Sequence, residues 1–92
     1  MTTKRIFVSG AVQGVGYRDW VVRTAQRGGV TGWVRNLRDG RVEILAAGSD
    51  DAIEALVAAC REGPARAQVA QIETVAADDE KQPKGFTKRF TA

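Results

Sequence analysis

Residues 5–18 read RIFVSGAVQGVGYR, a strand-like run that breaks into a glycine-rich loop. Within Arg5–Val12 successive side chains alternate between two faces, and neither face carries a charge beyond the first residue, which predicts a strand inside a sheet. Gly14 and Gly16 end this pattern. The segment Arg18–Arg27 then has helical spacing and stops at a pair of glycines. We therefore expect a strand, a glycine loop and a helix in succession.

The rest of the chain has the pattern of one more helix, three longer strands and a short final strand. A second helix is expected after Ser49, because its apolar residues fall at i, i+3, i+4 and i+7 and end with Cys60, which we interpret as a core residue. The last long strand changes the parity of its apolar positions near Ala70, which predicts a bulge. The predicted strands are Val30–Leu37, Arg41–Ala47 and Arg66–Ala76, with a short edge strand at Phe86–Phe90.

The resulting order is β-α-β-β-α-β. This order predicts an α+β, ferredoxin-like split βαβ fold, with an antiparallel sheet and two helices on one face. In that topology the first two strands run parallel and the third lies between them. The loop 13–18 and the end of the second strand near Asn36 should therefore meet at one edge of the sheet.

Composition limits the chemistry. The chain has 92 residues, 14 Lys and Arg against 11 Asp and Glu, a net charge of +3, one cysteine and no histidine. This length fits one domain, and we expect residues 1–92 to form it. The missing histidine excludes a Ser-His-Asp triad and an HExxH zinc site. One cysteine excludes an intrachain disulfide and the four-ligand structural zinc sites. Any reaction must rest on arginine, amide, carboxylate, hydroxyl or backbone N–H groups.

Charge and hydropathy patterns point away from nucleic acids and membranes. The basic residues are spread along the chain with acids between them, whereas nucleic-acid binding calls for a clustered basic patch. No apolar stretch approaches the roughly 20 residues of a membrane span, and no signal peptide is visible. We expect a cytoplasmic monomer with no nucleic-acid or membrane partner.

The glycine loop has two interpretations. Backbone N–H groups of such a loop converge on a concavity suited to an anion, and Arg18 adds donors for phosphate oxygens. Alternatively, the glycines only allow a tight turn and Arg18 is solvated. The loop matches neither a Walker A motif nor a dinucleotide fingerprint. Asn36 is likewise either a turn former or a carboxamide that faces the loop and binds a water and a phosphate oxygen.

Two segments, taken together, resemble the signatures of the acylphosphatase family. The resemblance rests on Val8–Arg18, on Gly32–Asn36 followed by Gly40, Val42 and Gly48, and on Gly63-Pro64, Ala67–Val69 and Phe86. It spans nearly the whole chain. Two positions depart from the family pattern: Tyr17 replaces the usual Phe or Met and should add a hydroxyl to a buried contact, and Lys88 replaces an apolar residue of the last strand.

The resemblance implies an enzyme that hydrolyses acyl phosphates to a carboxylate and inorganic phosphate, with no metal and no cofactor. Carried over, Arg18 and Asn36 are the catalytic residues: Arg18 binds the phosphoryl group and Asn36 positions the attacking water. The backbone N–H groups that hold the phosphate belong to Gln13, Gly14, Val15, Gly16, Tyr17 and Arg18. Because a carboxylate is a good leaving group, positioning and charge neutralisation can suffice without a histidine base.

Other functions are compatible with the same fold. A non-catalytic phosphate- or anion-binding regulatory module would use the same loop without turnover. An RNA-recognition domain needs aromatic residues on its sheet, and the segment Arg41–Ala47 has none. A third candidate is the acylphosphatase-like domain that starts larger carbamoyl-transfer proteins, against which the end of the chain at Ala92 favours a stand-alone enzyme.

Overall fold

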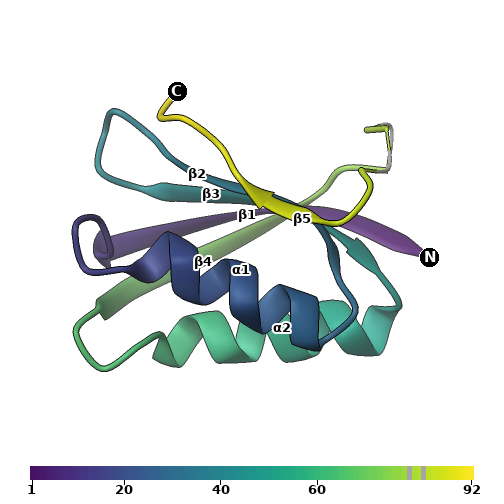
Figure 1. Ribbon diagram of the computed structural model, residues 1–92, viewed down its shortest axis with the longest axis horizontal. Coiled ribbons are helices and arrows are strands. Elements are labelled where there is room, and N and C mark those ends of the chain that lie inside the picture. Colours follow the sequence, from purple (N-terminus) through teal and green to yellow (C-terminus); the bar gives the residue numbers. More distant parts are fainter. Residues whose placement is uncertain (79, 82) are drawn as a thin grey trace.

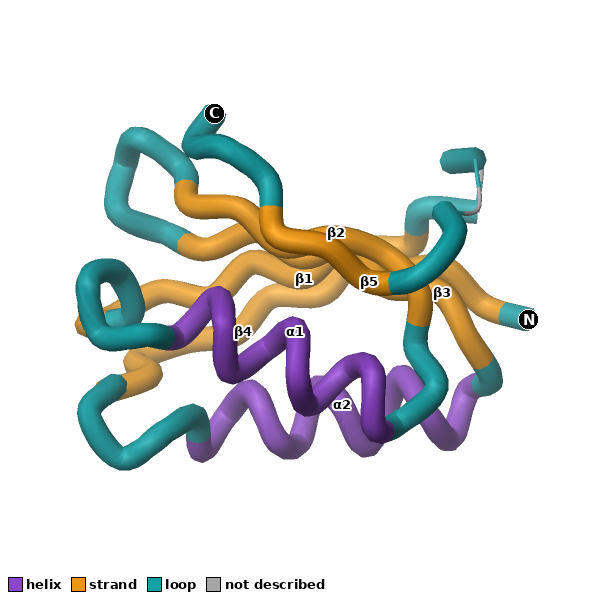
Figure 2. The backbone as a smooth tube through the Cα atoms, viewed as in Figure 1, coloured by secondary structure: helices purple, strands orange, loops and turns teal. Residues whose placement is uncertain are grey.

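A computed structural model describes residues 1–78, 80–81 and 83–92. It has one sheet with two helices packed on one face, the α+β ferredoxin-like architecture expected from the element order (Figures 1 and 2). Within the described residues, neither helix is long and apolar enough to cross a membrane. The elements are β1 (Thr2–Ala11), α1 (Tyr17–Arg27), β2 (Thr31–Asn36), β3 (Val42–Gly48), α2 (Asp50–Glu62), β4 (Gln68–Ala76) and β5 (Phe86–Lys88).

The strand order is β4-β1-β3-β2-β5. β1 and β2 each pair antiparallel with β3, so they run parallel to each other with β3 between them, as predicted. The prediction of an antiparallel sheet was wrong in one respect, because β5 pairs parallel with β2 and makes the sheet mixed. β4 runs antiparallel to β1, so it ends at the edge of the sheet where both β1 and β2 begin. The chain re-enters the sheet there, and Gly32 accordingly donates its N–H to the carbonyl of Gly85 at 2.8 Å.

The predicted bulge is present in β4. Ser9 of β1 pairs with Gln71, whereas the next residue, Gly10, pairs with Val69, so Ala70 is the extra residue. Gly10 has a φ of 122°, and a Cβ on it would lie 2.3 Å from the carbonyl oxygen of Gln68. The absence of a side chain at Gly10 therefore lets β4 approach β1 closely at the bulge, just before the chain enters the loop at residue 12.

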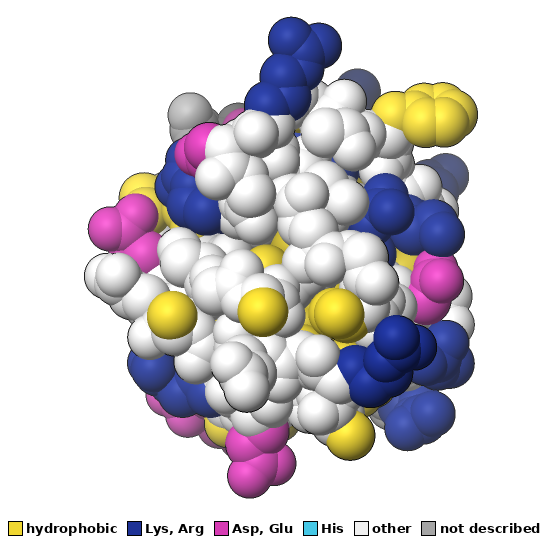
Figure 3. Space-filling model, turned by 90° about the vertical axis from the view of Figure 1, so that its left-hand side faces the viewer, with side chains coloured by type: hydrophobic (Ala, Val, Ile, Leu, Met, Phe, Trp, Pro, Cys, Tyr) yellow, Lys and Arg dark blue, Asp and Glu magenta, His cyan; other side chains and the backbone are white. Residues whose placement is uncertain are grey.

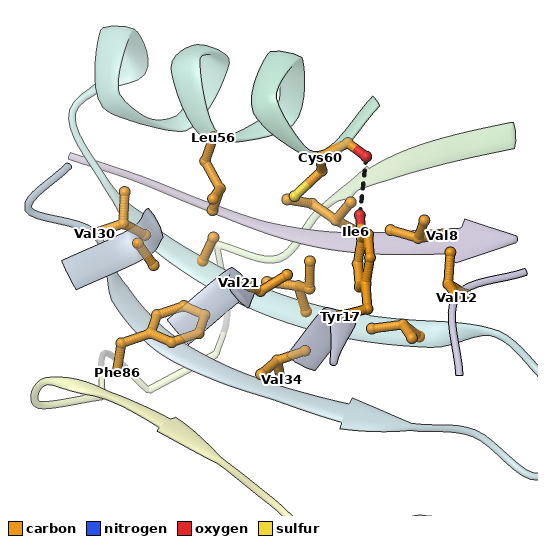
Figure 4. Packing of buried hydrophobic residues seen from close by; sticks show 14 of the residues in the cluster. Ile6, Val8, Val12, Tyr17, Val21, Val30, Val34, Leu56, Cys60 and Phe86 are labelled. Atoms are coloured by element: carbon orange, nitrogen blue, oxygen red, sulfur yellow. Dashed lines mark hydrogen bonds between the residues drawn. The ribbon is translucent and has the colours of Figure 1, made fainter. Parts of the chain in front are cut away.

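The core lies between the sheet and the helices (Figure 4). The apolar helix faces predicted from spacing are buried, and Cys60 is a fully buried core residue. The side chains in the core cluster include Ile6, Val8 and Val12 from the first part of the chain, Tyr17, Val21 and Ala25 from α1, Val34 and Ile44 from the sheet, Ile53, Leu56 and Cys60 from α2, and Phe86 from β5. This packing fixes α1, and with it the glycine loop that precedes α1.

The opposite face of the sheet is closed without helices. Trp33 packs there with Leu45 and Ala77. Glu43 is only 4% exposed on this face and pairs with both Arg5 and Arg35. The guanidinium of Arg35 also lies 4.7 Å from the ring centroid of Trp33. Two cations thus neutralise the buried carboxylate, as a buried charge requires.

Candidate active site

The glycine loop joins the end of β1 to the start of α1. Gly14 and Gly16 have φ values of 74° and 79°, and a Cβ on either would meet nothing within 4 Å. Glycine is therefore needed here for its backbone conformation and not for space. Gly16 is the N-cap of α1, and no side chain caps this helix. The loop thus leaves the positive end of α1 open.

The backbone N–H groups of this loop have no internal partners. Among the described residues, none of the N–H groups of residues 13–16 donates a hydrogen bond, and the first bond of α1 runs from the N–H of Trp20 to the carbonyl of Gly16 at 3.1 Å. Free N–H groups at a helix N-terminus favour an anion. The conformation therefore matches the anion-binding interpretation better than that of a simple tight turn.

A cavity of about 160 Å³ lies against the loop and is lined by Val12, Gly14, Gly16, Tyr17, Arg18, Asp19 and Lys88. Figure 3 views this end of the molecule, where Lys and Arg side chains surround a largely uncharged centre, with acidic side chains between them. A larger cavity of about 640 Å³ lies along α2 and β4 and contains none of the predicted site residues. The small cavity is lined by Arg18 and by two loop residues whose N–H groups are free, Gly14 and Gly16.

Asn36 is the last residue of β2 and is 9% exposed. Its side-chain oxygen Oδ1 is buried and accepts no hydrogen bond within the described part of the chain. Buried polar atoms are nearly always paired, and an exception calls for a ligand, a water or a functional role. Asn36 does not line the cavity beside Arg18, so the two residues approach the site from different elements.

Gln13 connects the loop to the hairpin that follows Asn36. Its Nε2 donates to the carbonyl of Leu37 at 2.8 Å and to the carbonyl of Arg41 at 2.9 Å. This contact confirms the expectation that the loop 13–18 lies beside the end of the second strand. The sequence had suggested only a backbone role for Gln13, so the clamp formed by its side chain was missed.

The first turn of α1 carries two further contacts. Asp19 Oδ1 lies 2.8 Å from Nζ of Lys88, and this ion pair holds the pKa of the Asp19 carboxyl below its ordinary value, with a smaller contribution from Arg18. The hydroxyl of Tyr17 donates to the carbonyl of Cys60 at 2.9 Å (Figure 4). This bond confirms the expectation that Tyr17 adds a hydroxyl to a buried contact.

The buried titratable groups beside the site stay neutral. Burial raises the pKa of the Tyr17 hydroxyl far above its ordinary value and raises the pKa of the Cys60 thiol to about 11. Neither group can therefore serve as a base or a nucleophile near neutral pH. Among the described residues no three His, Cys, Asp or Glu side chains are grouped so that they could hold a metal ion.

Comparison with known proteins identifies the family. The model of the family described as "Acylphosphatase" matches residues 4–90. The chain belongs to the acylphosphatase family. It is 48% identical over 91 residues to an acylphosphatase of Acidiphilium cryptum, and the match covers 99% of each chain.

Solved structures agree with this assignment. The crystal structure of an acylphosphatase from Bacillus subtilis is similar to this chain with a TM-score of 0.92 and 37% identity, over 97% of this chain and 99% of that one. Full-length HypF in its phosphate- and nucleotide-bound form is similar with a TM-score of 0.89 and 28% identity, but the match covers only 12% of that chain. The acylphosphatase fold therefore also occurs as a small part of a larger protein.

In this member of the acylphosphatase family the predicted site residues fall into two groups. Arg18 and two loop glycines line one cavity, whereas Asn36 lies at the end of β2, directly before Leu37, whose carbonyl accepts a hydrogen bond from Gln13 of the loop. Lys88, which the sequence marked only as a departure, lines the same cavity as Arg18. Its position on β5, two residues beyond the buried Phe86, places it on the helix side of the sheet and could have revealed this.

Proposed function

We propose that this protein hydrolyses acyl phosphates, with the loop 13–18 and Arg18 binding the phosphoryl group and Asn36 positioning the water. The observation that carries the proposal is the buried Oδ1 of Asn36, which accepts no hydrogen bond among the described residues. The loop that Gln13 ties to the hairpin directly after Asn36 likewise has unpaired N–H groups. The donors suit phosphate oxygens and the acceptor suits a water hydrogen. Membership of the acylphosphatase family supports the same reaction.

The reaction itself needs little from the protein. The water oxygen forms a bond to phosphorus while the bond from phosphorus to the carboxyl oxygen breaks, which releases a carboxylate and leaves inorganic phosphate. Loop N–H groups and Arg18 offset the charge on the phosphoryl oxygens, and a water held at Oδ1 of Asn36 points its lone pair toward phosphorus. Positioning and preorganised charge are the main contributions in phosphoryl transfer.

The test compares hydrolysis of benzoyl phosphate, in the presence of a chelator, by the wild type and by Asn36→Ala. Loss of one preorganised polar group should lower kcat by about 10²–10³. Gln71→Ala is a matched control, because it removes an exposed carboxamide of β4 that does not line the cavity beside Arg18. Its kcat should equal that of the wild type.

Two results would contradict the proposal. If folded Asn36→Ala turned over substrate at the wild-type rate, Asn36 would not position the attacking water. A folded wild type that binds inorganic phosphate at the loop but hydrolyses nothing would instead be the non-catalytic anion-binding module considered above.

We also propose that residues 1–92 act as one domain and as a monomer in the cytoplasm. The larger core cluster includes residues from β1 to β5, and the one cysteine is a buried free thiol that needs no oxidising compartment. Light scattering after size-exclusion chromatography should give the mass of one chain, and a dimer mass would contradict the monomeric state.

A further inference from the structure

The wall of the phosphate cavity carries an ion pair that the proposed mechanism does not use. Lys88 of β5 and Asp19 of α1 both line the cavity beside Arg18, and their charged atoms are 2.8 Å apart. Both side chains are substantially exposed, at 44% and 58%. An exposed ion pair contributes little to the stability of the fold, so we consider its effect on the charge of the cavity instead.

Asp19 has two opposite electrostatic effects. In the first turn of α1 its carboxylate stabilises the helix, because negative charge is favourable at a helix N-terminus. The same charge lies on the wall of a cavity suited to an anion, where it repels a phosphate. Asp19 is ionised near neutral pH, as an aspartate with its ordinary pKa already would be, and the pair with Lys88 lowers that pKa further, so the repulsion persists there.

Lys88 offsets this repulsion. The cavity lining holds three charged side chains, Arg18, Asp19 and Lys88, with a net charge of +1. Without Lys88 the charges of Arg18 and Asp19 would cancel. Phosphate carries up to two negative charges near neutral pH, so a change of one charge on the wall of its site has a large effect on affinity.

We propose that Lys88 is a positioning residue that neutralises Asp19 at the wall of the phosphate cavity and so keeps the cavity attractive to phosphate. This inference rests on the proposed function, because it takes the cavity to be the phosphate site. Lys88 acts through Asp19 and need not touch the phosphate itself.

The test measures binding of inorganic phosphate directly, by titration of the backbone amide signals of residues 13–18 in NMR spectra at low ionic strength. Lys88→Ile should weaken binding by about three- to tenfold. Lys88→Arg keeps the charge and should bind like the wild type. Lys84→Ile is the matched control: it removes the same charge from an exposed position ahead of β5, near the start of β2, and should leave the Kd unchanged.

Adding Asp19→Asn to Lys88→Ile separates the proposed effect from direct contact. The double variant should bind phosphate within about twofold of the wild type, since both opposing charges are gone. In 1 M salt the effect of Lys88→Ile should fall below about twofold, because the screening length is then about 3 Å. Kinetically, KM for benzoyl phosphate should rise while kcat stays constant, as expected for an interaction made equally in the ground and transition states.

Three results would overturn the inference. One is wild-type affinity in Lys88→Ile, and another is failure of Asp19→Asn to restore binding to Lys88→Ile, which would mean that Lys88 contacts the phosphate directly. The third is a wild type that binds phosphate nowhere near residues 13–18, which would remove the proposed function as well. The first two leave that function intact, so the two failures can be told apart.

Discussion

The hydroxyl of Tyr17 gives the sharpest prediction about stability. It is fully buried and donates to the carbonyl of Cys60, in the last turn of α2. The residue four positions beyond Cys60 is Pro64, which has no N–H, so α2 cannot supply the usual partner for this carbonyl. Tyr17→Phe would leave a buried acceptor unpaired while keeping the ring in place.

We expect Tyr17→Phe to lower the free energy of unfolding by about 1–3 kcal/mol, the cost of leaving a buried polar group unsatisfied. For a domain of this size each kcal/mol corresponds to about 4–8 °C in Tm. Urea unfolding monitored by circular dichroism at neutral pH measures the difference. A variant within about 0.3 kcal/mol of the wild type would refute the reasoning, because the carbonyl of Cys60 would then have found another partner.

The same bond predicts a pH dependence. Burial raises the pKa of Tyr17 in the folded state, so the unfolded chain loses this proton first, at its ordinary pKa of about 10. The stability due to Tyr17 is therefore fully present below about pH 10 and falls as the pH rises further. The difference between wild type and Tyr17→Phe should shrink by about 1.4 kcal/mol at pH 11. Both proteins should carry Cys60→Ala, because the Tyr17 hydroxyl lowers the pKa of the buried Cys60 thiol, so the titration of Cys60 would not cancel from the comparison.

Three further predictions concern other contacts. Glu43→Gln should lower the free energy of unfolding by about 1–3 kcal/mol in urea titrations, because two guanidinium groups lose their buried partner; unchanged stability would mean that water replaces the carboxylate. Gln13→Ala should lower kcat/KM for benzoyl phosphate about tenfold, since it releases the loop from the β2–β3 hairpin. An unaltered kcat/KM would show that the two hydrogen bonds of Gln13 are dispensable. Gly32→Ala should lower the free energy of unfolding by at least about 3 kcal/mol, because its Cβ would lie 1.7 Å from the carbonyl oxygen of Leu45. At Gly40 a Cβ meets nothing within 4 Å, so Gly40→Ala should lower it by only about 1 kcal/mol. Similar Tm values for the two variants would contradict this.

Much of the fold could be predicted because burial imposes its period on the sequence. The helical spacing of Ile53, Leu56 and Cys60 corresponds to a buried face of α2, and the parity change in β4 corresponds to the bulge at Ala70. The direction of β5 could not be predicted in the same way. A three-residue strand has little pattern of its own, and its partner depends on where the preceding chain returns to the sheet.

For the site, the sequence predicted which elements lie next to each other. Parallel β1 and β2 bring the loop 13–18 beside the end of β2, and the contacts of Gln13 confirm that proximity. The roles of Arg18 and Asn36 stay predictions. The pair formed by Lys88 and Asp19 depends on how β5 packs against α1. The position of Lys88 two residues beyond Phe86 indicates its face of the sheet but not its partner.

The central position of β1 has a consequence for the newly made chain. β1 leaves the ribosome before β3 and β4, which are its two partners in the sheet, and Lys4 pairs with Ala76. Until β4 has emerged, a strand containing Ile6 and Val8 keeps an unpaired edge, which is a site for association with other chains. Contacts between residues so distant in sequence also slow folding. The nascent protein should therefore need protection for β1 until residue 76 has emerged from the ribosome.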